Sequence, residues 1–358
     1  MLGLKAGKRV ISTLVALVAL LCVTYSFAND EGSSAAADPA TASFSAVAIE
    51  HFWKVYHGND YDGIPEVQTQ LRAALRRDPE NPTLYALLGA THFWHIGEAG
   101  RDRQQNDSAL GQDMPTAAHL FGKALSLDYY GTHLPGYVND DHLPGYLGIT
   151  TVHAGQMSGN DGLAAQGDDI LDSAAYQFPE FNNFNRWAAH NADPRDSESY
   201  RKALDSLWQA LDACIAGRLD RANPDVGPYL GLQTAVGRKK ACWSEGDLAP
   251  HSFEGFMLNL GNGLVKAGQI APARIVYANA KYADHYATWP YRQVLENIAS
   301  SDLQARAALY ADNNAAKDPP LGVPGRGCVY CHATAAEADS LQSRNDRLPL
   351  ASTARLRH

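Results

Sequence analysis

Apolar residues recur along most of this chain at the three- and four-residue spacing that places them on one face of a helix. The clearest single helix is expected over residues 199–218, whose apolar stripe consists of Tyr200, Ala203, Leu204, Leu207, Trp208, Leu211 and Ile215. An earlier helix is expected to end at Asp78-Pro79, because the residue before a proline is pushed out of the helical region. The pattern predicts an all-α fold.

The segment from Met257 to Tyr286 predicts two helices that pack against each other, joined by a turn at Gly268. Its face-forming residues are Met257, Leu260, Gly261 and Leu264 in the first helix, and Ala273, Tyr277 and Ala280 in the second. The small residues in this set allow two helices to approach closely, while the large ones fill the remaining gaps. In spacing and residue size the segment resembles a tetratricopeptide repeat.

Two earlier segments fit the same spacing once insertions are allowed between their paired helices. The matching residues are Tyr85, Leu88 and Gly89 with Ala117, Phe121, Ala124, Leu125, Leu127 and Asp128, and then Leu147 and Gly148 with Leu171, Ala174 and Pro179. The resemblance covers most of residues 43–300. It implies a tetratricopeptide-like helical-repeat solenoid whose concave surface binds a partner protein or peptide. For the stretched units, an irregular helical bundle is the alternative.

The first 42 residues differ from the rest. Residues 1–28 begin with basic side chains, continue with an apolar run from Val10 to Val23 and end in Ser26-Phe27-Ala28, which together predict a signal peptide for export to the periplasm. An uncleaved membrane anchor is the alternative, although the run is shorter than a spanning helix requires. Lipid attachment at Cys22 is disfavoured by Leu21 before it. Residues 29–42 predict a flexible leader, and no later stretch is apolar enough to cross a bilayer.

The composition narrows the function classes. The 358 residues are 45% hydrophobic and 19% charged, which excludes a disordered or collagen-like chain. The formal net charge is −9, and it becomes −12 when the three basic residues of the signal peptide are removed. Such a charge argues against a protein whose partner is nucleic acid. It favours a basic partner protein, whose association would weaken as salt increases.

Export changes the interpretation of the cysteines. In an oxidising compartment Cys214 and Cys242 are expected to form a disulfide with a structural role, and two buried thiols are the alternative. The remaining pair lies in Cys328-Val329-Tyr330-Cys331-His332, after a helix end and a Pro/Gly-rich linker over residues 301–327. This Cys-x-x-Cys-His spacing is the signature of c-type haem attachment.

The signature has a physical basis. The thiols of Cys328 and Cys331 add across the two vinyl groups of a haem, and His332 on the same helical turn lies under the iron as its proximal ligand. A thioredoxin-like redox pair would need a βαβ context, and a zinc site would need a second ligand pair. The sequence therefore predicts a covalent haem c held by residues 328–358.

The second axial position of the iron is not assigned by the motif. The residues after His332 include no methionine, and their one histidine is His358. The distal ligand is thus expected from the helical array, where Met257, His251 and His285 are the nearest candidates in sequence. Further candidates are Met114, Met157, His92 and His95. A five-coordinate iron with an open site is the alternative.

Taken together, these features predict a periplasmic single-haem c-type cytochrome that carries one electron and docks a redox partner protein through a helical array. Residues 43–300 are expected to fold without the haem segment, because repeat arrays are stabilised by neighbouring helix pairs. Two alternatives remain open: a haem enzyme or gas sensor with an open distal site, and a helical scaffold for envelope assembly.

Overall fold

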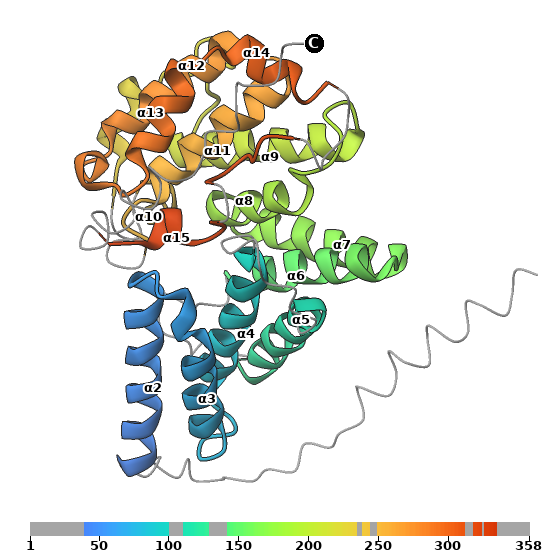
Figure 1. Ribbon diagram of the computed structural model, residues 1–358, viewed down its shortest axis with the longest axis vertical. Helices are drawn as coiled ribbons and strands as arrows, with labels where there is room; N and C mark the ends of the chain where they lie inside the picture. The colour runs from blue at the N-terminus through green and yellow to red at the C-terminus, as the bar shows by residue number, and fades with distance from the viewer. Residues whose placement is uncertain are drawn as a thin grey trace, which may run out of the picture. The chain divides into compact units, whose positions relative to one another are not determined.

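The computed structural model describes residues 39–99, 110–128, 142–234, 238–243, 249–311, 318–323 and 326–334. The regular elements in these ranges are helices, with one isolated bridge between Val323 and Arg326 (Figure 1). The prediction of an all-α protein is therefore confirmed for this part of the chain. Among these helices, none is both long and apolar enough to span a membrane.

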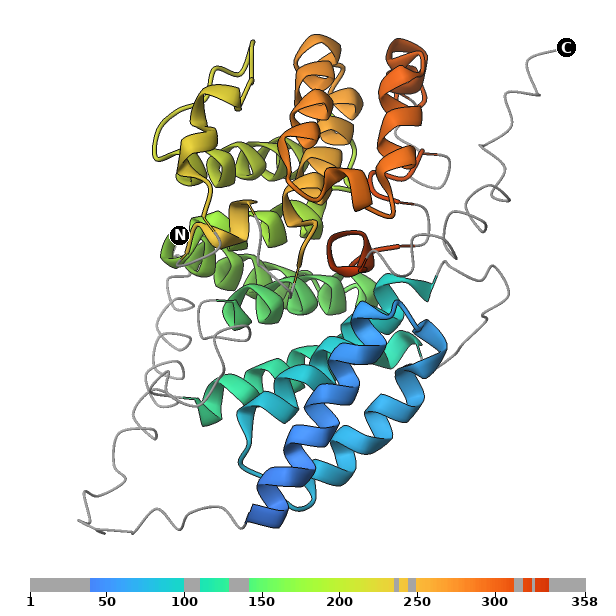
Figure 2. The ribbon, with the colours of Figure 1, turned by 90° about the vertical axis from the view of Figure 1, so that its left-hand side faces the viewer.

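Most of the chain between Pro39 and Ser300 is organised as consecutive helices. They are α2 (Pro39–His57), α3 (Ile64–Leu75), α4 (Pro82–Gly97), α5 (Leu110–Leu127), α6 (Leu143–Ser158), α7 (Asp161–Gln177), α8 (Pro179–His190), α9 (Glu198–Ile215), α10 (Lys240–Trp243), α11 (Ser252–Lys266), α12 (Ile270–Asn279) and α13 (Arg292–Ser300). Short 3-10 turns are η1 (Tyr61–Gly63), η3 (Gly227–Leu232), η4 (Ala280–Tyr282) and η5 (Tyr286–Thr288). From α2 to α9 each helix packs on the next one (Figures 1 and 2).

Helix α9 shows how closely the apolar pattern determines an element. The seven residues of the expected stripe are all buried. The Ser197 hydroxyl accepts a hydrogen bond from the Tyr200 amide at 3.1 Å, which satisfies one of the unpaired donors at the start of the helix. The helix ends at Ile215, three residues earlier than the pattern indicates, because Ala216 adopts a left-handed conformation with φ 51°.

The predicted pair at Met257–Tyr286 is formed by α11 and α12. Gly268 lies in the turn between them with φ 77°, a conformation that favours glycine. Gly261 packs directly under the Tyr277 ring, where an added Cβ would lie 2.2 Å from a ring carbon. The Tyr277 hydroxyl donates to Asn262 Oδ1 at 2.7 Å. The predicted turn and the predicted close approach at Gly261 are both confirmed.

The structure places one boundary near the N-terminus differently from the sequence analysis. Helix α2 begins at Pro39, inside the leader expected over residues 29–42, whereas the expected signal peptide over residues 1–28 lies outside the described residues. The apolar positions of α2 continue in register through Ala48, Phe52 and Val55, all of which are buried.

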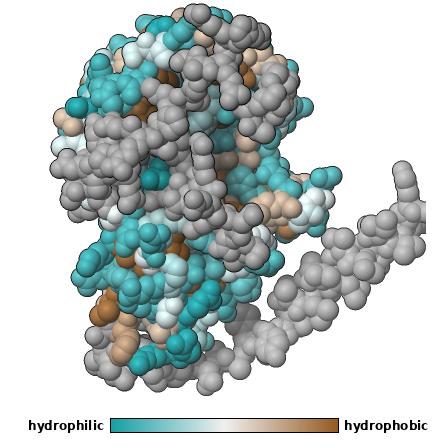
Figure 3. Space-filling view, in the orientation of Figure 1, coloured by the Kyte–Doolittle hydropathy of each residue, from teal (hydrophilic) through white to brown (hydrophobic). Residues whose placement is uncertain are grey.

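On the face shown in Figure 3, the coloured surface over α2 and α3 is largely polar, with apolar residues scattered among the polar ones.

The described residues of the C-terminal segment, up to Thr334, belong to the same compact unit as helices α2 to α13. Within the expected linker, α14 (Leu303–Ala308) forms another helix. Three side chains donate to successive carbonyls of the Pro-rich stretch: Tyr310 to Pro319 O at 3.1 Å, Arg306 to Pro320 O at 3.0 Å and Asn262 to Leu321 O at 2.8 Å. These hydrogen bonds hold residues 319–321 against α11 and the end of α14.

A disulfide links two of the helices. Cys214 at the end of α9 is bonded to Cys242 in α10, with 5.8 Å between their Cα atoms. This is the pair that the sequence analysis expects. The bond ties α10, a helix of four residues, to the much longer α9.

Candidate functional site

The Cys-x-x-Cys-His motif forms the one-turn helix α15 (Val329–His332), which begins directly after Cys328. Cys328, Cys331 and His332 are each partly exposed, whereas Val329 and Tyr330 are 0% and 5% exposed. The spacing of one helical turn brings the two thiols and the imidazole close to one another along the chain, and the two intervening residues are buried. Neither cysteine is in a disulfide. We call Gly327–His332 the attachment turn.

A carboxylate from a distant helix holds the start of the attachment turn. Oε1 of Glu98, at the end of α4, accepts hydrogen bonds from the amides of Gly327, Cys328 and Val329 at 3.0, 2.9 and 3.1 Å. The Glu98 side chain is fully buried. These amides begin a helical turn and lack partners within it, so a carboxylate is well suited to satisfy them.

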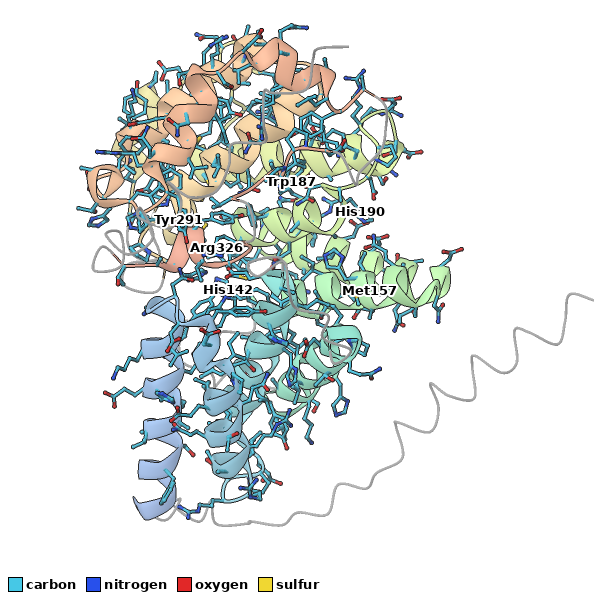
Figure 4. The ribbon with its side chains drawn as sticks, in the orientation of Figure 1. His142, Met157, Trp187, His190, Tyr291 and Arg326 are labelled. Atoms are coloured by element: carbon cyan, nitrogen blue, oxygen red, sulfur yellow. A yellow bond between two sulfur atoms is a disulfide. The ribbon has the colours of Figure 1, made fainter. Side chains whose placement is uncertain are left out.

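Tyr330 anchors the middle of the turn in the core. Its hydroxyl accepts from Asn259 Nδ2 at 2.8 Å, and its carbonyl accepts from Trp289 Nε1 at 2.7 Å. Asn259 in turn accepts from the indole of Trp187 at 3.3 Å (Figure 4). Burial raises the pKa of the Tyr330 phenol well above its ordinary value, so it remains a neutral hydrogen-bonding group. The turn is thereby fixed to α8, α11 and the segment before α13.

The end of the turn lies on α11. The amide of His251 donates to the Cys331 carbonyl at 3.1 Å. The Cys331 sulfur packs against Gly255, where an added Cβ would lie only 2.2 Å from Sγ. Any larger residue at this position would therefore displace the thiol.

Helix α2 covers the other side of the turn. The Tyr56 ring lies 4.9 Å from the His332 ring between centroids, and the Thr334 amide donates to the His57 carbonyl at 3.4 Å. Burial, followed by the proximity of Cys328, raises the pKa of Tyr56 well above its ordinary value, and the phenol hydrogen-bonds the Cys328 side chain. Tyr56 also packs edge-on against Trp94 at 5.0 Å.

These features fit a covalently attached haem. Both thiols and the imidazole belong to one helical turn, and all three side chains are partly exposed, whereas Val329 and Tyr330 are buried. Gly255 provides the space that the Cys331 sulfur occupies. Among the residues described, no group of three or more His, Cys, Asp or Glu side chains is arranged to hold a metal ion by itself.

No protein-family model, curated protein or solved structure matches this chain.

The three main candidates for the distal ligand have different surroundings. His251 is buried beside the attachment turn, and its Nδ1 lies 3.0 Å from Oε1 of the buried Glu254. His285 is exposed, with its ring 6.3 Å from that of His251. Met257 is fully buried in the core on α11. The structure thus brings His251 into contact with the motif and places His285 next to His251.

The secondary candidates are engaged elsewhere. Nδ1 of His92 and Nδ1 of His95 lie 2.6 and 2.7 Å from the two carboxylate oxygens of Asp113. Although burial opposes it, these hydrogen bonds lower the pKa of Asp113. Met114 is buried in α5, and Met157 is half exposed near the end of α6 (Figure 4).

Several functional contacts were not predicted from the sequence. Glu98, Tyr56, Gly255, Asn259 and Trp289 all touch the attachment turn but come from helices or turns far from it in the chain. None belongs to a short motif, and Gly255 and Asn259 lie on a helix whose pattern indicates only core packing. A fold-level contact map is needed to find such residues.

A surface cavity of about 370 Å³ lies between α7, α8 and α9, away from the motif. Its charged side chains pair with one another: Arg186 with Asp172 at 2.9 Å, Lys202 with Glu198 at 2.7 Å, and His190 with Asp168 at 2.7 Å. Hydrogen bonds to Asp168 and then Asp193 raise the pKa of His190 to about 9. The charged side chains that line this cavity are therefore paired with one another across its wall.

Proposed function

We propose that this protein is a periplasmic single-haem c-type cytochrome that carries one electron to or from a partner protein. The observation that carries the proposal is the attachment turn, in which Cys328, Cys331 and His332 remain partly exposed while Val329 and Tyr330 are buried in the core. The motif is therefore a helical turn that is hydrogen-bonded to α4 and α11, and the side chains of Cys328, Cys331 and His332 are partly exposed on it.

Each residue of the turn has a role in this proposal. Cys328 and Cys331 would hold the haem through thioether bonds, and His332 would bind the iron as proximal ligand. The bound haem would supply a one-electron couple. Tyr56 packs against His332, and Tyr330 anchors the turn in the core, so the imidazole would move little when the iron changes its oxidation state. Such limited movement would lower the reorganisation energy of electron transfer.

Among the distal candidates the surroundings favour His251 over Met257 and His285. The ring nitrogen of a metal-ligating histidine that does not bind the metal usually donates a hydrogen bond to a carboxylate or carbonyl, which orients the ring and increases the basicity of the imidazole. His251 has such a partner in Glu254 at 3.0 Å. Its backbone is already bonded to Cys331.

The partner surface and location follow from the rest of the chain. We propose that the helices between residues 43 and 300 form a tetratricopeptide-like solenoid that docks the redox partner, and that residues 1–28 direct export. The paired helices α11 and α12, with the glycine turn and the close packing at Gly261, support the repeat interpretation. A net negative chain favours a basic partner, so electron transfer should slow as ionic strength rises.

The first experiment tests the haem. The exported protein and its Cys328→Ser/Cys331→Ser variant are separated on a denaturing gel and stained for covalent haem. The parent should stain and the variant should not. The matched control is Cys214→Ser/Cys242→Ser, which removes the other cysteine pair and should keep the stain. A parent that does not stain would overturn the assignment and leave the scaffold interpretation.

The second experiment distinguishes a carrier from an enzyme. The ferrous parent should give a six-coordinate, low-spin optical spectrum and bind carbon monoxide slowly. His251→Ala should convert it to a high-spin form that binds carbon monoxide quickly, while Met257→Ala and His285→Ala should not. Fast binding by the parent together with peroxide turnover would instead indicate a haem enzyme or gas sensor with an open distal site.

A further inference from the structure

Among the described residues around the attachment turn, Glu98 combines a long separation in sequence, full burial and three hydrogen bonds to the turn. It is separated from the turn by more than two hundred residues, it is fully buried, and a single oxygen of its carboxylate accepts three consecutive backbone amides. A carboxylate only accepts hydrogen bonds, and it accepts more strongly than a neutral group. Glu98 therefore provides what three parallel N–H donors require.

The geometry points to a specific role. We propose that Glu98 is the positioning residue of the haem site: it folds residues 327–329 into the start of the turn, so that Cys328 and Cys331 face the same side, and its charge makes the bound iron harder to reduce. The proposal rests on the function proposed above. It concerns a residue outside the Cys-x-x-Cys-His motif.

The positioning effect follows from the spacing of the contacts. The amides of Gly327, Cys328 and Val329 point the same way where the backbone enters the helical turn, and that turn places the side chain of residue 331 one turn above that of residue 328. Without the carboxylate, the buried amide of Val329 and the partly buried amides of Gly327 and Cys328 would lose their partner, which is unfavourable in a folded chain. The turn would then open, and the two thiols would no longer lie side by side.

The electrostatic effect follows from burial. Ferric haem carries one more positive charge than ferrous haem, so a negative charge nearby stabilises the ferric form. Glu98 contacts the backbone of Cys328, one of the two thioether positions, and water does not screen it because the side chain is fully buried. Its removal should shift the ferrous-to-ferric ratio at a fixed ambient potential by about tenfold, which is about 59 mV for one electron.

Three full-length variants separate these effects. Glu98→Gln keeps an oxygen acceptor of similar size but removes the charge, and Glu98→Ala removes both. Asp113→Asn is the control: it removes another buried carboxylate, which bonds His92 and His95 but not the attachment turn. The measurements are amide hydrogen exchange at residues 327–329, haem per chain by denaturing-gel stain, and the midpoint potential of the haem-loaded protein.

We expect Glu98→Ala to speed exchange of the three amides at least tenfold and to lower haem per chain. Glu98→Gln should retain most of the protection and most of the haem, but its midpoint potential should rise by about 59 mV. Asp113→Asn should leave the exchange of residues 327–329 unchanged.

Two results would overturn the proposal. One is unchanged amide protection in Glu98→Ala, and the other is a Glu98→Gln potential that shifts no more than that of Asp113→Asn. The exchange measurement needs no haem, so a parent chain that carries none would contradict the proposed function while the amide data still decide whether Glu98 holds the turn.

Discussion

Replacement of Gly255 by alanine tests the packing between the attachment turn and α11. An added Cβ would lie 2.2 Å from the Cys331 sulfur and 3.0 Å from a ring carbon of Tyr330. Contacts this short do not persist, so the turn must move away from α11 by about 1 Å or more to restore ordinary packing. The movement would stretch the bonds from His251 to Cys331 and from Trp289 to Tyr330.

The magnitude follows from opposing contributions. Alanine in a helix interior is favoured over glycine by about 0.5–1 kcal/mol. Overpacking a buried contact costs about 1–3 kcal/mol, and each hydrogen bond that is weakened costs up to about 1.5 kcal/mol. The unfavourable contributions are larger, and Gly255→Ala should lower the free energy of unfolding by about 1–3 kcal/mol. It should also reduce haem staining.

The assay is denaturant unfolding followed by circular dichroism, with two comparisons. Gly122→Ala is the matched control, because Gly122 lies inside α5 and an added Cβ would meet its nearest neighbour at 3.9 Å. It should stabilise the protein. In a Cys331→Ala background, the cost of Gly255→Ala should fall by at least half, since the sulfur that clashes is gone. Equal stability of Gly255→Ala and the parent, or no relief from Cys331→Ala, would refute this account of the contact.

Two further predictions concern stability. The pKa of His190 is raised from 6.5 to about 9 by its carboxylate partners, so the stability it contributes is fully present below pH 6.5 and is lost as the pH rises through 9. In urea unfolding the parent should therefore have a lower free energy of unfolding at pH 9.5 than at pH 6, and His190→Gln should lack this decrease. Equal decreases in the two proteins would contradict the prediction. Replacing Cys214 and Cys242 by serine opens a crosslink spanning 28 residues and should lower the free energy of unfolding by about 3–4 kcal/mol, which a reduced parent chain should reproduce.

The elements that the sequence predicts well are those set by local pattern. The stripe over residues 199–218 and the small residues of the pair at Met257–Tyr286 place apolar surface at fixed intervals, and a helix follows from such intervals wherever its partner lies. The ends of elements are less predictable. Helix α2 begins at Pro39, inside a stretch whose composition indicates a leader, because its apolar positions only become informative further along the chain.

The candidate site divides in the same way. Cys328, Cys331 and His332 are identified by spacing alone, since the chemistry of attachment needs those residue types at those intervals. What holds them is not visible in the sequence. In the sequence, Glu98 is one of 39 acidic residues and Gly255 is one of 30 glycines, and no motif distinguishes either of them. Their importance comes from contacts across more than seventy residues of chain, which no local pattern encodes. The Pro-rich stretch before the motif indicates a linker because the hydrogen bonds that hold its carbonyls come from side chains that its own sequence does not reveal.

The position of the attachment turn has a mechanical consequence. The turn is bonded to α4 through Glu98 and to α11 through His251 and Asn259, and Thr334, two residues after it, is bonded to the carbonyl of His57 in α2. It therefore acts as a staple across helices that would otherwise contact mainly their neighbours along the chain. If the array flexes when a partner docks, α4 and α11 cannot shift relative to each other without loading the backbone that carries both thiols. If His332 binds a haem iron as proposed, bending of the helical array would therefore also strain the bond between His332 and the iron.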